Sequence, residues 1–320
     1  MTQTKQPPAN PGRFNDVVGV DVSKGWIDVF DPREGSARVA CASEELSRLA
    51  RGWARRGALV VFEATGGYDR PLRDALVAAG AAHARVNPAR ARRFAQASGR
   101  ARTDAADARM LARMGAALKL DPTPAPPPER AALQGLIARR RQLVKAICAE
   151  ATRLQQTGER WLRGEIRRLI RVLEAALARL EKRTAALIAS AGLAEASRRL
   201  QTAPGVGPTV AATLLAEMPE LGRLSAKAAG SLAGLAPIAR DSGRREPPRA
   251  IGGGRPTPRR MLWIAALHAT RCNPRFKACR ERLEAKGKPP KQAITAAARK
   301  LVVILNAMMR DEKDFDAAMN

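Results

Sequence analysis

One proline-rich segment divides the chain and limits how it can fold. Residues 121–128, DPTPAPPP, contain five prolines in eight positions. Proline fixes φ and lacks a backbone N–H, so this segment cannot continue a helix and favours an extended spacer. The chain has 320 residues, more than the roughly 250 at which single cores stop growing. We therefore expect a domain boundary here.

Before the spacer, short apolar runs alternate with helical patterns. Strands alternating with helices predict an α/β domain with a mixed sheet. The first two strands are joined by Ser23-Lys24-Gly25, which is typical of a tight turn. In chain order the predicted elements are strands over 17–20 and 26–30, a helix over 44–56, a strand over 58–62, a helix over 68–79, a strand over 83–86 and a helix over 104–114 with Thr103 as its N-cap.

Beyond the spacer the pattern is helical. Leucine and isoleucine recur at helical spacing over 133–180, with a break near Gly158. This pattern predicts two long helices, either as a helical hairpin or as a coiled-coil contact with a second subunit. Further helices are predicted up to Glu217 after the turn 204–208, and over 226–235, 259–271 and 291–310.

The charge balance points to a polyanionic partner. The chain carries 57 Lys and Arg against 30 Asp and Glu, a net charge of +27, and every segment shares the excess. A sequence pI near 11.4 is typical of proteins that bind nucleic acid. Aromatic residues make up 3% of the chain, which argues against a base-stacking platform and favours arginine contacts with backbone phosphates.

Other features predict a cytoplasmic protein. The longest apolar stretches, such as 301–305, fall short of the about 18 residues of a membrane span, so we expect none. The N-terminal segment lacks the basic and apolar regions of a signal peptide. Reduced thiols are expected, because no CxxC spacing joins the four cysteines, Cys41, Cys148, Cys272 and Cys279.

Four acids are candidates for chemistry. Asp21 follows Val-Gly-Val in a buried-type strand, and Glu63 stands at the end of another. Asp104 and Asp107 are three residues apart and share one helix face, where their like charges repel unless cations offset them. Carboxylate oxygens alone favour Mg²⁺ or Mn²⁺. Taken by themselves, Asp104 and Asp107 are equally well explained as acids at a helix N-terminus.

Three segments resemble the N-terminal blocks of the DEDD insertion-sequence transposases. They are VGVDVSK from Val18, VFEATGGY from Val61 and RTDAADARMLAR from Arg102. The family includes Piv-type invertases and bridge-RNA-guided recombinases. The resemblance implies a RuvC-like, ribonuclease H-like fold whose acids bind Mg²⁺ or Mn²⁺, and the matching positions are Asp21, Glu63, Asp104 and Asp107.

The C-terminal part resembles the transposase domain of the same family. The matching motifs are PGVGP from Pro204, LLAE from Leu214, GLAP from Gly234, DSG from Asp241 and GKP from Gly287. The resemblance implies that Ser242 is a nucleophile that forms a phosphoserine bond with DNA. Without it, Ser242 would be an ordinary loop serine before glycine. Where the family has Ile-Ser-Lys-Arg-Gly-Asn, this chain has three glycines after Ile251, and Arg255, Arg259 and Arg260 are candidates to reach the same phosphates.

The remaining candidates are less specific. Arginine clusters on helices are usually solvated faces, although the charge excess favours nucleic acid contact. A glycine turn at 204–208 resembles a helix-hairpin-helix turn, and a structural turn explains it equally well. His83 and His268 are lone histidines, and we expect His268 to be packed. The remaining nucleic-acid candidates are Arg139, Arg140, Arg141, Arg167, Arg168, Arg244, Arg245, Gly205 and Gly207.

The sequence therefore predicts three domains. These are a RuvC-like metal-binding domain over 14–121, a helical, coiled-coil connector over 129–199 and a mostly α, serine-bearing domain over 200–310. The resemblance implies cleavage and rejoining of DNA strands by a homo-oligomer, a dimer or tetramer, with a structured guide RNA, at the nucleoid and away from membranes. Alternatives are a metal-dependent junction nuclease, a catalytically silent nucleic-acid-binding regulator and an actin-like sugar kinase, which the charge of +27 fits poorly.

Overall fold

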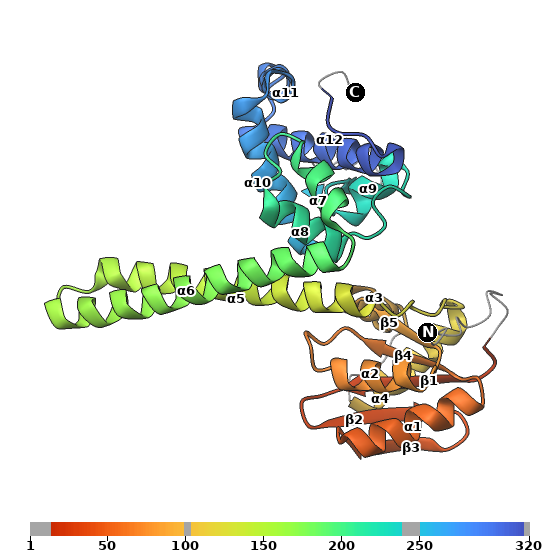
Figure 1. The fold of residues 1–320 in the computed structure, drawn as a ribbon. Helices are drawn as coiled ribbons and strands as arrows, with labels where there is room; N and C mark the ends of the chain where they lie inside the picture. The colour runs from red at the N-terminus through yellow and green to blue at the C-terminus, as the bar shows by residue number, and fades with distance from the viewer. Residues whose placement is uncertain (1–13, 99–103, 239–249, 317–320) are drawn as a thin grey trace. The chain divides into compact units, whose positions relative to one another are not determined.

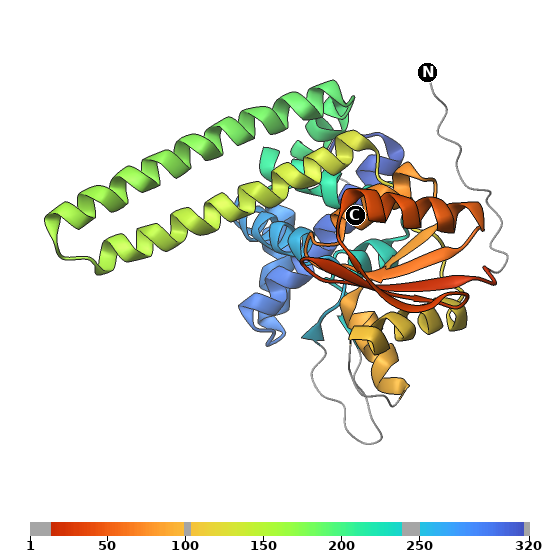
Figure 2. The same ribbon diagram turned by 90° about the horizontal axis from the view of Figure 1, so that it is seen from below.

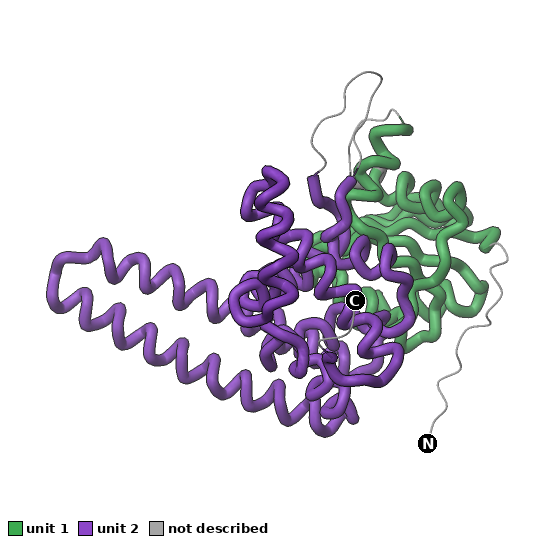
Figure 3. The backbone as a smooth tube through the Cα atoms, turned by 90° about the horizontal axis from the view of Figure 1, so that it is seen from above, with its two compact units in different colours: residues 1–125 green, residues 126–320 purple. Residues whose placement is uncertain are grey.

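The computed structural model describes residues 14–98, 104–238 and 250–316 (Figure 1; Figure 2 gives a second view). The chain divides into two compact units (Figure 3), unit 1 over residues 1–125 and unit 2 over residues 126–320. The division falls within the proline-rich segment.

Unit 1 contains a mixed sheet, as predicted, and the sheet has five strands. The strand order is β3-β2-β1-β4-β5, with β1, β2 and β3 antiparallel and with β4 and β5 parallel to β1. The sequence patterns missed β3, because this edge strand is exposed at most positions and shows no clear apolar alternation. The strands are β1 (Val17–Val22), β2 (Trp26–Asp31), β3 (Gly35–Ala40), β4 (Leu59–Glu63) and β5 (His83–Val86).

Helices cover both faces of this sheet. One layer contains α1 (Ser43–Arg55) and α2 (Arg70–Ala78), and the other contains α4 (Asp104–Ala117). Successive residues of a strand face opposite layers, so Val18 and Val20 pack with α1 and α2 while Val17 packs with α4. The short helix α3 (Pro88–Ala97), which was not predicted, follows β5 and contacts α4.

Gly19 allows α4 to lie directly on β1. A Cβ atom at this position would lie 1.8 Å from the carbonyl oxygen of Ala108 and 2.6 Å from the backbone nitrogen of Ala112. Both neighbours are helix backbone and cannot turn aside as a side chain can. Glycine is therefore required for this close approach.

Unit 2 begins with a helical hairpin, one of the two predicted arrangements. The helices α5 (Pro128–Gln156) and α6 (Arg160–Ser190) pack against each other. Glu159 caps α6 by accepting hydrogen bonds from the backbone N–H groups of Trp161 and Leu162, at 2.8 and 2.6 Å. Arg163 closes the turn by donating to the carbonyl oxygens of Leu154 and Thr157, both at 2.7 Å.

The rest of unit 2 is a helical core with a small two-stranded sheet. Its buried cluster includes Leu214 of α8, Leu262 of α10 and Leu301 of α12. The sequence patterns missed α7, α11 and both short strands. The elements are α7 (Ala194–Gln201), α8 (Pro208–Glu217), α9 (Ala226–Leu232), β6 (Pro237–Ile238), β7 (Ala250–Ile251), α10 (Pro256–Cys272), α11 (Pro274–Ala285) and α12 (Pro290–Asp311).

Helix α12 is the one helix in the described part of the chain that is long and apolar enough to cross a membrane. In this structure 56% of its apolar window is buried within the protein, where the helix packs against α7, α9, α10 and α11. Core helices meet the same length and composition criterion. The helix itself was predicted, over 291–310, but the count of uninterrupted apolar residues did not mark it as a candidate span because Arg299 and Lys300 interrupt it.

Candidate active site

Asp21 and Glu63 occupy neighbouring positions on two parallel strands. Val20 of β1 pairs with Phe62 of β4, so the next residues along both strands are Asp21 and Glu63. The two acids lie on the sheet face that α4 covers, because Gly19 and Val61, two residues earlier, face α4. Both side chains are partly exposed. The register thus brings together two of the four predicted acids.

The first turn of α4 reaches the same end of the sheet. A Cβ atom on Gly115 would meet the side chains of Val17 and Val61, while Ala108 touches β1 at Gly19. The helix therefore runs antiparallel to β1, and its first turn, with Asp104 and Asp107, reaches the level of Asp21. Asp107 is partly exposed. The backbone of α4 begins at Asp104, whose side chain lies outside the described part of the structure.

A further acid, Asp28, lies in this region and was not singled out from the sequence. Asp28 of β2 is the direct register partner of Asp21. Its side chain is buried and accepts two hydrogen bonds from Arg38 of β3, from Nε at 2.9 Å and from Nη2 at 3.0 Å. The sequence contained a signal, because an acid between Ile27 and Val29 in a strand resembles the pattern that identified Asp21.

The donor set suits a hard divalent cation. Carboxylate oxygens are the ligands that Mg²⁺ and Mn²⁺ prefer, and the backbone brings Asp21, Glu63 and Asp107 to one end of the α4 face. Among the residues with described side chains, no three carboxylate, imidazole or thiol groups lie close enough to form a complete cation site. The residues therefore fit a cation in chemistry and lie at the same end of the sheet, without forming a closed three-ligand group.

Ser242 lies outside the described residues, as do Arg244 and Arg245, but the two strands that flank this segment are described. Pro237 and Ile238 of β6 pair antiparallel with Ile251 and Ala250 of β7. Directly beside this sheet, a Cβ atom on Gly254 would lie 2.3 Å from the backbone nitrogen of Gly234. Gly254 is one of the three glycines found where the resembling family has a basic residue. Its lack of a side chain lets its backbone pass close to that of Gly234.

The three arginines that follow these glycines have different surroundings. Arg255 donates from Nη1 and Nη2 to the two carboxylate oxygens of Glu220, both at 2.7 Å, and from Nη1 to the carbonyl oxygen of Glu217 at 2.6 Å. Arg259 donates to the carbonyl oxygens of Gly234 and Gly253 at 3.4 Å. Arg260 is exposed and has no ion pair within the described residues. Among these three candidates, Arg260 is best placed to meet a phosphate.

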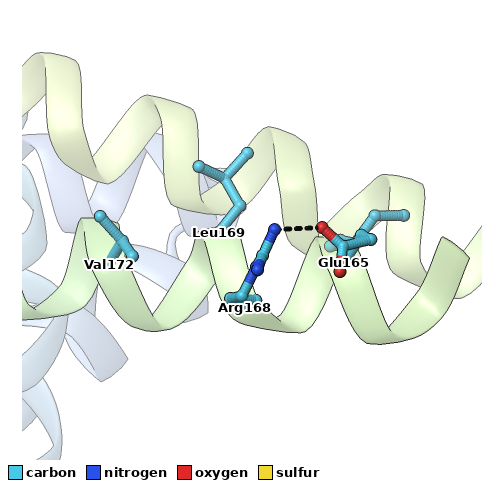
Figure 4. A pocket seen from close by; sticks show the side chains of 5 residues that line it. Glu165, Arg168, Leu169 and Val172 are labelled. Atoms are coloured by element: carbon cyan, nitrogen blue, oxygen red, sulfur yellow. Dashed lines mark hydrogen bonds and ion pairs between the residues drawn. The ribbon is translucent and has the colours of Figure 1, made fainter. Parts of the chain in front are cut away.

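The arginines of the hairpin also differ. Figure 4 shows a shallow hollow on α6 where Arg168 pairs with Glu165, at 2.6 Å. Arg140 pairs with Glu181 of α6 at 2.9 Å. Arg139 and Arg141 donate to Gln142 and Thr257, at 3.2 and 2.8 Å. Arg167 is exposed without an ion pair in the described part of the chain.

The glycines of the turn over 204–208 have separate roles. A Cβ atom on Gly205 would lie 2.1 Å from the carbonyl oxygen of Ala265, so this glycine is explained by close packing against α10. Its φ of +79° also favours glycine. Gly207 precedes α8 and faces open space. Phosphate contact at either glycine stays a prediction.

The two histidines differ in their surroundings. His83 is buried, with Nδ1 3.1 Å from the carbonyl oxygen of Ala81, and burial lowers the pKa of its imidazole. The prediction that His268 is packed is wrong. It is exposed on α10, and its Nδ1 lies 3.4 Å from Sγ of Cys272, one helical turn later. The apolar pattern misled because Leu267 and Ala269 beside it take the inward positions.

The strand order and the positions of the acids define unit 1 as a ribonuclease H-like domain of the DEDD type. A family model described as "Transposase", for DEDD transposases of the IS110 type, matches residues 18–157, and one described as "Transposase IS116/IS110/IS902 family" matches residues 197–281. The chain belongs to the IS110 family of insertion-sequence transposases. No curated protein matches the chain.

Family membership establishes the general function of the chain. It supports a DNA-binding enzyme that cleaves and recombines DNA. DEDD transposase domains in general depend on divalent metal ions. The first match contains all four acids, and the second contains Ser242.

Proposed function

We propose that this transposase cleaves and rejoins DNA strands through a covalent phosphoserine intermediate at Ser242. The observation that carries the proposal is the gathering of Asp21, Glu63 and the first turn of α4 at one end of the sheet. A phosphoryl-transfer enzyme can use acids gathered in this way to hold divalent cations. The acids Asp21, Glu63, Asp104 and Asp107 would hold Mg²⁺ or Mn²⁺, which when bound lowers the pKa of an attacking hydroxyl and stabilises phosphate charge.

In the proposed reaction, the Ser242 hydroxyl loses its proton and its oxygen forms a bond to phosphorus. The bond between phosphorus and the leaving deoxyribose oxygen breaks, and that oxygen takes up a proton. Attack by a deoxyribose hydroxyl of another DNA end then forms the new phosphodiester and restores the serine. Each step exchanges one phosphate ester for another, so rejoining needs no external energy source.

Two variants separate this proposal from its rivals. Asp21→Asn keeps the shape of the side chain and removes a charge from the cation site, and we expect cleavage to fall at least about 1,000-fold with DNA affinity retained. Ser242→Ala should abolish the covalent adduct and recombination. A junction nuclease would keep cutting DNA after Ser242→Ala, and a silent regulator would show no cleavage to lose. Recovery of a protein–DNA adduct mapped by mass spectrometry to Ser242 is the direct measurement.

We also propose that the transposase acts as a homo-oligomer, a dimer or tetramer. Several large apolar side chains are exposed on α6; they are Trp161, Leu162, Leu169 and Val172. Burial of such a strip against a second copy would remove apolar surface from water. Light scattering of the full chain tests this, with Leu169→Lys expected to shift the protein toward the monomer.

A structured guide RNA is the second proposed partner. The net charge of +27 and the exposed arginines of the hairpin support it. RNA transcribed from the noncoding DNA beside the gene should bind in the presence of a large excess of unrelated RNA. Equal affinity for both RNAs would remove the guide from the proposal. We further propose that residues 129–199 act as a connector, and that the protein acts in the cytoplasm at the nucleoid.

A further inference from the structure

Charged residues form one row across the sheet of unit 1. Asp21 pairs with Asp28, and Asp28 pairs with Arg38, so the row of adjacent positions runs from Glu63 on β4 through β1 and β2 to β3. Like charges directly opposite each other destabilise a strand pair. The two hydrogen bonds from Arg38 offset the charge of Asp28 and tie the row to the edge strand.

Trp26 extends this row toward solvent. It lies two residues before Asp28 and therefore on the same face of the sheet, at the end of β2 that adjoins the end of β1 beyond Asp21. The guanidinium carbon of Arg38 lies 5.1 Å from the centre of the Trp26 ring. Trp26 is 44% exposed, and the Arg38 side chain is 53% exposed.

An ion pair that serves only to neutralise Asp28 does not require an exposed indole. Aromatic residues make up 3% of the chain, and Trp26 is one of the few that the structure exposes. An indole with an arginine held against it is instead well suited to a nucleotide, since the ring can stack on a base and the guanidinium can contact phosphate. The position fits, because β3 lies two strand spacings from β1, about 10 Å.

We propose that Trp26 and Arg38 bind the DNA strand beside the phosphate that is cleaved, with Asp28 as the positioning residue that holds Arg38. The site contains one ring, so it is consistent with a chain too poor in aromatic residues for an extended stacking platform. This inference rests on the proposed function, because it takes Asp21 and Glu63 as the acids at which DNA is cleaved.

The test is photochemical cross-linking of the full chain to a single-stranded DNA oligonucleotide that contains 5-iododeoxyuridine. Mass spectrometry of the digested adduct should place a cross-link on Trp26. Trp26→Phe should retain at least half of the DNA cleavage rate, because phenylalanine still stacks, whereas Trp26→Ala should lower that rate about tenfold. Arg38→Lys should weaken binding about threefold or more, because lysine keeps the charge and loses the paired hydrogen bonds.

Matched controls come from the opposite layer of the same unit. Val77 is 42% exposed and Arg70 pairs with Asp74, both on α2. Val77→Ala and Arg70→Ala should leave cleavage and cross-linking unchanged. Melting temperatures of all variants identify any loss that comes from unfolding.

Three results would overturn the inference. One is full cleavage by a folded Trp26→Ala variant, and another is cross-linking that maps elsewhere. The third is cross-linking of Trp26 to an iodouridine-labelled RNA but not to DNA, which would assign the pair to RNA. The proposed function is tested separately by Asp21→Asn. If that variant loses cleavage while Trp26→Ala does not, the docking site is wrong and the metal-assisted chemistry stands.

Discussion

The candidate acids of unit 1 lie on paired strands and on a packed helix, whereas the candidate serine of unit 2 falls, in the sequence, between the two-residue strands β6 and β7. In unit 1, the register of β1 with β4 and the contact of α4 with Gly19 fix the backbone at the acids. In unit 2, the pairing of β6 with β7 and the crossing of Gly254 with Gly234 fix the base of the serine segment. Metal ligands need a rigid frame, which elements of secondary structure supply.

Both units depend on glycines that meet helix backbone, and alanine at these positions should have the largest effects on stability. Gly205→Ala brings Cβ to 2.1 Å from a carbonyl oxygen of α10 at a φ of +79°, and Gly19→Ala brings Cβ to 1.8 Å from one in α4. We expect each to lower the free energy of unfolding of its own unit by more than about 3 kcal/mol. Hydrogen exchange measured separately in β1 and α10 shows which unit responds.

Two open glycines provide the controls. Gly52 in α1 and Gly135 in α5 have nothing within 4 Å of an added Cβ. Alanine at either should raise stability by about 0.5–1 kcal/mol, because glycine is a poor helix former. If the amide hydrogens of β1 exchanged no faster in the Gly19→Ala variant than in the Gly52→Ala variant, the direct contact of α4 with β1 would be incorrect.

A smaller effect is expected at Asp31, an ion-paired carboxylate of unit 1. Burial raises the pKa of Asp31, but hydrogen bonds from the Arg33 backbone, Arg56 and Trp53 outweigh it, so the pKa lies below its ordinary value. A carboxylate with a depressed folded-state pKa contributes its stability above the unfolded pKa, about 4, and loses that contribution as pH falls through the folded value. Asp31→Asn should therefore cost about 2 kcal/mol at pH 7.

The measurement for Asp31 is chemical denaturation of the native chain and the variant from pH 7 to pH 2. The difference in unfolding free energy should shrink as the pH falls below about 4. A difference that stays constant with pH would show that the carboxylate charge is not its source.

The sequence predicted most of unit 1 because its central strands, such as β4, are continuous apolar runs and its turns contain glycine. It failed for β3, whose stability comes from backbone pairing and from the bonds between Arg38 and Asp28 rather than from its own pattern. For the site, the acids could be named from the family resemblance. The row formed with Asp28 could not, because strand register depends on which residues pair across the sheet.

Unit 2 shows the same limit at Arg255. Its sequence position favoured phosphate contact, whereas the structure pairs it with Glu220, 35 residues earlier. The segment between the two residues contains α9, β6 and β7, and the packing of these elements decides such a pair. Local sequence patterns do not contain that information. The short helices α7 and α11 were missed for a related reason, since each is rich in charged residues and has few buried positions.

The smallest expected effect is at the pair of Glu220 and Arg255, whose side chains are 37% and 34% exposed. Burial raises the pKa of Glu220, but the hydrogen bonds from Arg255 outweigh it and the pKa is lowered. Because water screens a partly exposed pair, Glu220→Gln should cost about 1 kcal/mol or less at pH 7. That cost should also fade below about pH 4.5, since the folded-state pKa is the lower one.

The same variant also tests what Arg255 does. Glu220→Gln weakens the restraint on Arg255, so if Arg255 can also bind phosphate, DNA affinity at low salt should rise severalfold. Arg255→Ala would then lower that affinity. If Arg255 only anchors the segment after the glycines, both variants should leave DNA affinity unchanged, and Arg260→Ala alone should lower it. Fluorescence anisotropy with a labelled duplex, measured at two salt concentrations, distinguishes the two roles.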